Sequence, residues 1–104
     1  MEPGIVVVFR SRLRDGALPL KEELNEAVAA TTPDHPGLLS WKSFDAPDGE
    51  RVTIVEFTDE AAYCAWVREP AHVAAKSRRL EVYEEVSTTV GAITEPVRRW
   101  AAPS

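Results

Sequence analysis

The sequence lacks several features that mark common classes of protein. It has a single cysteine, Cys64, which excludes an intramolecular disulfide and provides no cysteine-based metal framework. The first residues carry no basic segment followed by a long apolar stretch, and no later run reaches the length of a membrane span. We therefore expect a cytoplasmic protein that does not act on a membrane.

Basic residues are too few for an ordinary nucleic-acid surface. The chain has 12 Lys and Arg against 17 Asp and Glu, a formal net charge of −5, whereas nucleic-acid-binding domains normally carry a basic excess. No paired His, Cys or Asp spacing indicates a metal site, and no nucleophile elbow indicates a hydrolase. The length of 104 residues fits one domain over residues 1–104, with a core of about 5–94 and a C-terminal tail of 95–104.

The N-terminal half predicts a strand, a helix and a hairpin. Residues 4–13, "GIVVVFRSRL", are β-branched and continuously apolar in their first part, which is typical of a strand covered on both faces. Residues 18–33 place Leu20, Leu24 and Val28 at helical spacing. In residues 38–57, "LLSWKSFDAPDGERVTIVEF", two strand-like runs flank the strong hairpin signal Asp48-Gly49.

The C-terminal half predicts a helix in two pieces and a last strand. "TDEAAYCAWVRE" begins a helix for which Thr58 is a plausible N-cap. Pro70 suits the first turn of a second helical piece that runs from about residue 71 to 79. Residues 82–93, with Val82 and Val86 in alternation, predict a strand, and Pro96 ends it.

This order of elements indicates an α+β protein with a ferredoxin-like βαββαβ antiparallel sheet and both helices on one face. The strands nevertheless carry apolar residues on both faces: Val6, Val8, Val52 and Ile54 on one, and Val7, Phe9, Val55 and Phe57 on the other. A monomer of this size seldom leaves such a patch in water. We therefore expect a homodimer that is closed by sheet-on-sheet packing.

From about Ile5 to Thr94 the chain resembles the antibiotic biosynthesis monooxygenase (ABM) family. The resemblance is carried by the hairpin "SWKSFDAPDGERVTIVEF", the helix start "TDEAAYCAW" and the following "EPAHVAA". It implies a dimeric α/β barrel. Some members of the family oxidise aromatic polyketides or quinols with O2 and without metal or flavin, others degrade haem, and many have no known activity.

The haem-degrading branch fits this sequence poorly. Its motif has a tryptophan that Trp66 matches, and an axial histidine ten residues later, where this chain has Lys76. A protonated lysine is a poor iron ligand. The asparagine expected in the first strand has no counterpart, and His72 comes about one helical turn too early. The resemblance therefore favours an enzyme that needs no cofactor.

The oxidising branch implies an apolar cavity for a small aromatic substrate and a group that assists its deprotonation. His72 has a suitable pKa for a general base. Arg10 or Lys42 is a candidate to hold an anionic oxygen. The candidate walls of the cavity are Trp41, Trp66, Phe9, Phe57 and Tyr83.

Each candidate also has a purely structural interpretation. His72 fits the first turn of a short helix, Trp66 and Trp41 fit the core or a dimer interface, and His35 fits a surface loop. Cys64 lies in an apolar helix, which favours a buried, inert thiol. The alternative to a cofactor-independent monooxygenase is therefore a non-catalytic dimer that binds a small ligand or takes part in a stress response.

Overall fold

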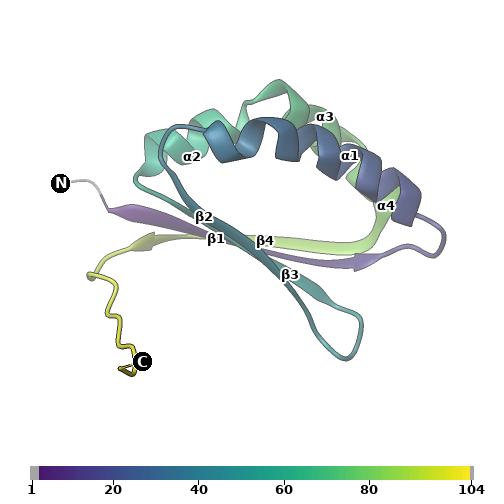
Figure 1. Ribbon diagram of the computed structural model, residues 1–104. Helices are drawn as coiled ribbons and strands as arrows, with labels where there is room; N and C mark the ends of the chain where they lie inside the picture. Colours follow the sequence, from purple (N-terminus) through teal and green to yellow (C-terminus); the bar gives the residue numbers. More distant parts are fainter. Residues whose placement is uncertain (1–2, 104) are drawn as a thin grey trace.

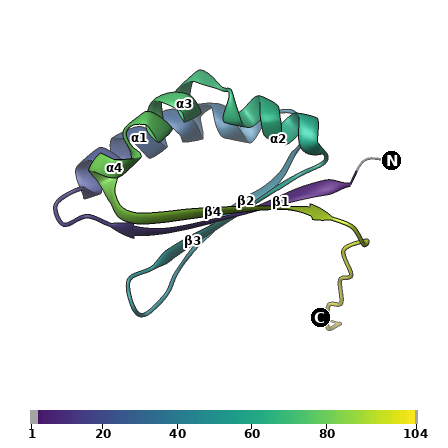
Figure 2. The ribbon, with the colours of Figure 1, turned by 180° about the vertical axis from the view of Figure 1, so that it is seen from behind.

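A four-stranded antiparallel sheet forms one layer of the molecule, and all helices lie on one of its faces (Figures 1 and 2). The computed structural model describes residues 3–103. The elements are β1 (Gly4–Leu13), α1 (Leu18–Thr31), a 3-10 turn η1 (Thr32–Asp34), β2 (Leu38–Asp45), β3 (Arg51–Phe57), α2 (Glu60–Val67), α3 (Pro70–Ser77), α4 (Arg79–Val82) and β4 (Tyr83–Ile93).

The strand order is β2-β3-β1-β4, and every neighbouring pair is antiparallel. The two central strands, β1 and β3, are therefore not consecutive along the chain, as expected where each helical segment crosses over the sheet. The predicted ferredoxin-like α+β class is confirmed. None of the described helices is long and apolar enough to cross a membrane.

The predicted hairpin between β2 and β3 is present. Its tight turn is closed by two backbone hydrogen bonds, from Ala46 N to Glu50 O at 2.8 Å and from Gly49 N to Ala46 O at 3.0 Å. Gly49 has φ +93°, a conformation that glycine adopts without the steric cost of a Cβ. The Asp48 side chain also accepts a hydrogen bond from Glu50 N at 3.1 Å, which explains the aspartate before the glycine.

Two carboxylates begin the second helical segment, and the predicted cap at Thr58 is wrong by one residue. Asp59 is the N-cap of α2, because its Oδ1 accepts from Ala62 N at 2.8 Å. Glu69 caps α3, and Pro70 occupies its first turn as predicted. Asp and Thr side chains can both accept a hydrogen bond from the N3 amide of a helix. Residue type alone therefore does not distinguish Thr58 from Asp59 as the N-cap.

The last strand begins one residue later than expected, because Val82 ends the short helix α4. Arg14, the residue that follows β1, holds the junction between α4 and β4 in place. Its backbone amide donates to Val82 O at 2.8 Å, and its Nε donates to Leu80 O at 2.7 Å. Val82 is 1% exposed, so its apolarity reflects its burial as the last residue of α4 rather than a place in β4.

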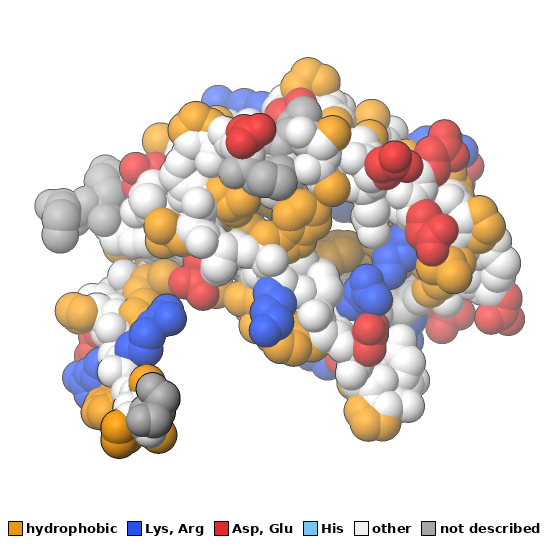
Figure 3. Space-filling model, in the orientation of Figure 1, with side chains coloured by type: hydrophobic (Ala, Val, Ile, Leu, Met, Phe, Trp, Pro, Cys, Tyr) orange, Lys and Arg blue, Asp and Glu red, His pale blue; other side chains and the backbone are white. Residues whose placement is uncertain are grey.

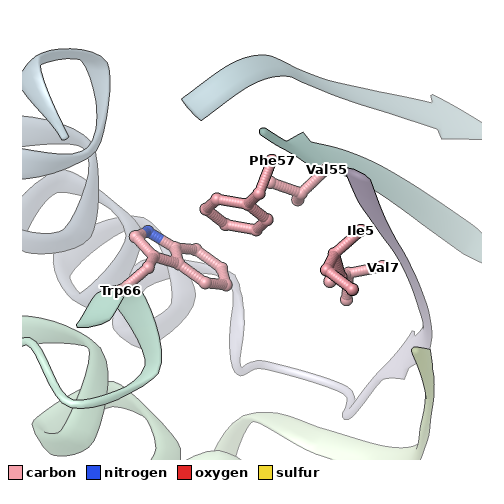
Figure 4. Packing of buried hydrophobic residues seen from close by; sticks show 5 residues of the cluster. All are labelled: Ile5, Val7, Val55, Phe57 and Trp66. Carbon is pink, nitrogen blue, oxygen red and sulfur yellow. The ribbon is translucent and has the colours of Figure 1, made fainter. Parts of the chain in front are cut away.

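The core lies between α2 and the two central strands. Its buried cluster comprises Ile5, Val7, Val55, Phe57 and Trp66. Figure 4 shows the Trp66 indole turned toward the Phe57 ring, with the aliphatic side chains beside them on the strands; the two ring centroids are 5.4 Å apart. Burial of these side chains fixes the α2 end of the helix layer against the sheet.

Strand register assigns each apolar residue to a face. Val7 lies opposite Val55 and points toward the helices, whereas Val8 lies opposite Ile54 and points to the face that no helix covers. We call this second surface the open face; its apolar members on the three strands β1, β2 and β3 are Val6, Val8, Phe44, Val52 and Ile54. Four of them are half-buried by neighbouring strands, and Phe44 is 48% exposed.

The described part of the C-terminal tail leaves the end of β4 without joining the sheet (Figure 1). Val97 is 63% exposed and Trp100 is 83% exposed. Both side chains therefore lie almost free of the rest of this chain.

Candidate functional site

A cavity of about 220 Å³ separates the helices from part of the sheet. Figure 3 shows the hollow between the two layers, with hydrophobic side chains in and beside it and basic side chains along its border. Its floor comes from the helix-covered face of the strands and its roof from all four helices. The lining residues are Val7, Phe9, Ser11, Lys21, Asn25, Val28, Trp41, Ser43, Arg51, Thr53, Val55, Tyr63, Trp66, Val67, His72, Ala75, Lys76, Arg79, Tyr83 and Thr88.

The structure brings five of the seven predicted site residues to this cavity. They come from β1, β2 and the segment that runs from α2 through α3 to the start of β4. They are Phe9, Trp41, Trp66, His72 and Tyr83.

Phe57 and Arg10 do not line the cavity. Phe57 is fully buried in the core behind Trp66. Arg10 pairs across the sheet with Val52 and therefore projects from the open face, where it makes a two-pronged hydrogen bond to Glu50 at 3.2 and 2.8 Å. Lys42 lies on the same open face opposite Ile54. An anion held in the cavity thus needs a different cation from those proposed from the sequence.

Trp66 is both a core residue and a cavity wall, and a hydrogen-bond chain fixes its position. Its indole Nε1 donates to Thr32 Oγ1 at 3.3 Å, and the Thr32 hydroxyl donates to Val28 O at 2.7 Å. Thr32 is 1% exposed. The chain joins α2 to the end of α1, and a turn of the indole would leave its buried N–H without this acceptor.

His72 is placed by the cap of α3 and by contact with Trp66. The Glu69 carboxylate accepts hydrogen bonds from Ala71 N at 2.9 Å and His72 N at 3.2 Å. The imidazole lies 4.1 Å from the Trp66 ring, centroid to centroid, at an interplanar angle of 52°. Its Nδ1 is buried and has no hydrogen-bond partner among the described residues.

These surroundings lower the pKa of His72 below its ordinary value of 6.5. Burial is the largest cause, the positive charge of Lys76 adds to it, and Glu69 opposes both. His72 is consequently neutral at pH 7, the form in which an imidazole can accept a proton.

Phe9 and Tyr83 form an aromatic pair in the cavity wall. Their rings meet edge to face with centroids 5.7 Å apart, a favoured arrangement for aromatic side chains. Burial raises the pKa of Tyr83, and the nearby Arg51 partly offsets this rise. The phenol therefore stays protonated at neutral pH and can donate a hydrogen bond.

The cavity also contains polar residues that were not singled out in the sequence. Lys21 and Asn25 come from α1, four residues apart and one turn before Val28, so all three lie on the face of α1 that turns toward the sheet. Arg51 and Thr53 share their face of β3 with Val55. The two-residue alternation of β3 puts Arg51 and Thr53 on this face, whereas the apolar spacing in α1 gives no sign that Lys21 and Asn25 line a cavity.

Lys21 and Arg51 differ in how their charges are balanced. Arg51 Nε and Nη2 donate to the two carboxylate oxygens of Asp45 at 2.8 and 3.1 Å. Lys21 is 9% exposed and forms no ion pair within 4.0 Å of any described carboxylate. Burial lowers the pKa of Lys21 and repulsion from Arg51 lowers it further, while the charges of Asp45 and Glu22 offset part of this.

Other candidate groups lie elsewhere or form no cluster. His35 is half-buried rather than on the surface, and its Nε2 donates to Ala62 O at 3.0 Å, so it links η1 to α2. Cys64 is half-buried and does not line the cavity. Among the described residues, no group of three or more His, Cys, Asp or Glu side chains is placed to hold a metal ion.

Comparison with known proteins identifies the fold through solved structures. Neither a protein-family model nor a curated protein sequence matches the chain. The structure of Rv0793 from Mycobacterium tuberculosis matches with a TM-score of 0.77 at 20% identity, over 94% of this chain and 99% of that one. SnoaB, a cofactor-independent oxygenase from Streptomyces nogalater, matches with a TM-score of 0.71 at 17% identity, over 98% of this chain and 99% of that one.

A third match is a Nitrosomonas europaea protein that is assigned provisionally to the antibiotic biosynthesis monooxygenases. Its TM-score is 0.76 at 9% identity, and the match covers 94% of this chain and 97% of that one. At such low identity the similarity establishes the architecture and not the reaction. The resemblance seen in the sequence is thus confirmed at the level of the fold: the chain has the ferredoxin-like fold that structures of ABM type share.

Proposed function

We propose that this protein oxidises a small phenol or quinol with O2, without a metal or organic cofactor, and that His72 acts as the general base. The observation that carries the proposal is the placement of a neutral imidazole against Trp66 in the wall of an aromatic-lined cavity. A binding site for a planar apolar molecule and a group able to take its hydroxyl proton are then in one place.

The surroundings of His72 indicate which nitrogen meets a ligand. Nδ1 is buried without a partner, so Nε2 is the nitrogen available to a substrate hydroxyl. Because the pKa is lowered, the imidazole is unprotonated and ready to accept at pH 7. The protonated Tyr83 phenol is a donor that can orient a second oxygen of the substrate.

The proposed reaction balances with O2 as the oxidant. His72 takes the proton of the phenol, and the phenolate passes one electron to O2, which gives superoxide and a phenoxyl radical. These recombine through a new C–O bond at a ring carbon. His72 returns its proton to the resulting peroxide, which becomes a hydroperoxide. Loss of the hydrogen on the same ring carbon, with cleavage of the O–O bond, then releases water and leaves a quinone, with one oxygen atom of O2 in the product and the other in water.

We propose further that the protein is a homodimer in which two open faces pack together. The open face presents four half-buried aliphatic side chains and the half-exposed Phe44. Covering this face would remove from water an apolar surface that the helices leave untouched. The cavity lies on the opposite side of the sheet, so the two halves of the proposal can be tested separately.

Oxygen uptake tests the catalytic proposal. A panel of one- and two-ring phenols and hydroquinones is supplied to the wild type, to His72→Ala and to His35→Gln, with the rate of spontaneous oxidation subtracted. We expect His72→Ala to lower kcat by about 100-fold or more, the usual contribution of a general base. His35→Gln is the matched control, because the other histidine lies outside the cavity. Equal rates for wild type and His72→Ala would remove the base from the mechanism.

A non-catalytic binding protein is the second candidate, and one observation favours it. No described carboxylate or backbone carbonyl pairs with Nδ1 of His72, whereas a catalytic histidine is commonly oriented through its second nitrogen. In a binding protein, His72 would form a hydrogen bond with the bound ligand, as donor or acceptor, without proton transfer. Ligand binding with no oxygen uptake by either the wild type or the variant supports this candidate.

A further inference from the structure

We infer that the ligand of this cavity is a one- or two-ring aromatic carboxylate, with its anionic group beside Lys21 and Arg51 and its ring toward Trp66 and His72. The inference deepens the proposed function, since it names the substrate class for the same cavity. It also holds for the non-catalytic alternative, because it concerns binding alone.

The charges that line the cavity are of one sign. Four basic residues contribute to the wall, namely Lys21, Arg51, Lys76 and Arg79, and no Asp or Glu among the described residues does. The whole chain has the opposite balance, with 17 acidic residues against 12 basic ones. An acidic protein that gathers cations around its cavity attracts anions to that site.

Lys21 has the strongest need for an anionic partner. Its side chain is almost fully covered, it forms no ion pair with a described carboxylate, and it lines the cavity. A buried charge is costly unless it is paired. The amide of Asn25, one turn further along α1, lines the same part of the wall and adds a hydrogen-bond donor.

Asp45 does not neutralise this end of the cavity. Both of its oxygens are engaged by Arg51, and together with Lys21 the three groups leave one net positive charge. Lys76 and Arg79 add exposed cations at the border, and neither forms an ion pair with a described residue. A single carboxylate at Lys21 would balance the buried excess.

The opposite end of the cavity is aromatic, which sets the orientation of the ligand. Arg51 and Val55 are four residues apart on β3, about 13 Å at the usual rise of a strand. Phe9 and Thr53 face each other midway between them, and Trp66 and His72 form the far end. Two fused rings with polar groups at opposite ends span this arrangement, with the carboxylate at Lys21 and a hydroxyl near His72.

The size of the cavity fits the same class. An engineered cavity of about 150 Å³ holds benzene, and sites for drug-sized ligands begin near 300 Å³. The volume of about 220 Å³ lies between the two, which favours one or two rings over an extended polycyclic molecule.

Calorimetric titration with two matched probes tests the inference. One probe is 6-hydroxy-2-naphthoate, and the other is 6-(hydroxymethyl)-2-naphthol, which has the same rings and hydroxyl but no charge. Measurements are made without O2, so that turnover plays no part. We expect the wild type to bind the acid at least about 10-fold more tightly than the alcohol, because charge-assisted hydrogen bonds are stronger than neutral ones.

Variants assign that preference to Lys21. Lys21→Met should weaken binding of the acid by about 10- to 100-fold and change binding of the alcohol by less than about twofold. Lys21→Arg should retain most of the preference. Arg68→Met is the control, because it removes the same charge from an exposed position outside the cavity, and we expect it to bind both probes as the wild type does.

Three results would overturn the inference: no binding of the acid, equal binding of acid and alcohol by the wild type, or an equal loss for both probes in Lys21→Met. The first two comparisons need only the wild type, so they hold even if a variant fails to fold.

His72→Ala separates this inference from the proposed reaction. If it loses oxygen uptake and still prefers the acid, both proposals stand; if the wild type prefers the acid but consumes no O2, only the reaction fails.

Discussion

The two faces of the sheet are built from the same strands and yet have different surroundings. On the covered face, Val55 is 2% exposed and Phe57 is fully buried under α2. One residue away along β3, Ile54 lies on the open face, where it is only half-buried. Two apolar residues that are neighbours on one strand can therefore differ widely in how deeply this chain buries them. The covered face forms the core of the chain, and the open face is the surface that the proposed dimer would cover.

Truncating one phenylalanine on each face should give the largest contrast. Phe57→Ala removes a fully buried ring that contacts Trp66 and Tyr63, and we expect the free energy of unfolding to fall by about 3–5 kcal/mol. Phe44→Ala should cost less than about 1 kcal/mol in dilute protein, because Phe44 is half-exposed. Urea unfolding measures both. Similar losses for the two variants would mean that the open face contributes to the fold of the monomer.

A charge on the open face should affect assembly instead of folding. Val8→Glu places a carboxylate at the centre of the proposed interface, where its desolvation opposes association. We expect light scattering at micromolar concentration to show a dimer for the wild type and a monomer for this variant, with dimerisation weakened more than about 100-fold.

Val90→Glu is the matched control for that experiment. Val90 pairs with Val7 and so lies on the helix side of the sheet, where it is 43% exposed. The same substitution there should leave the dimer intact. A monomeric wild type, or dissociation by both variants alike, would contradict packing through the open face.

On the covered side, removal of the Thr32 hydroxyl should have an intermediate effect. Thr32→Val keeps the shape of the side chain but removes the hydroxyl that accepts from the indole N–H of Trp66, while Val28 O keeps its hydrogen bond from the backbone amide of residue 32. We expect a loss of about 1–3 kcal/mol in the free energy of unfolding. Thr32→Ser retains the hydroxyl and should lose less. Trp66 fluorescence during urea unfolding measures the difference, and equal losses would show that the hydrogen bonds contribute little.

The smallest expected effect is the pH dependence contributed by His72. Its pKa in the folded protein is lowered by burial and by Lys76, against the opposing charge of Glu69, whereas in the unfolded chain it is near 6.5. The unfolded chain therefore binds more protons as the pH falls below about 6.5, and wild-type stability decreases. His72→Gln lacks this group.

The difference in stability between wild type and His72→Gln should consequently shift against the wild type between pH 8 and pH 5. Thermal unfolding across this range measures it. A difference that does not change with pH would show that His72 has an ordinary pKa and is more accessible to water than its buried Nδ1 indicates.

Much of the fold followed from the sequence because local signals and burial agree in it. The apolar run of β1, the Asp48-Gly49 turn and the proline at the start of α3 each determine one element, and the register of β1 with β3 confirms the predicted faces. The predicted helix and strand boundaries were wrong by one residue where neighbouring residues are equally suited to the same position. Asp59 rather than Thr58 caps α2, and Val82 has the apolarity of a strand residue while it ends a helix.

The site was less accessible to sequence reasoning, because it depends on which distant elements meet. Aromatic residues attract attention in any sequence, and five predicted residues do line the cavity. Arg10 was placed on the wrong side because a single step along a strand reverses the direction of a side chain. Lys21 was missed because a lysine followed by two glutamates is normally solvated, and only the packing of α1 shows that it is covered.

The hydrogen-bond chain from Trp66 through Thr32 to Val28 divides the cavity wall into a rigid and a yielding part. The elements that it joins, α1 and α2, each contain buried core residues, whereas α3 contains no buried residue. Backbone amides of α3 should therefore exchange with deuterium sooner than those of α1 and α2. Binding of the proposed ligand should slow that exchange, because α3 carries His72 in the cavity wall.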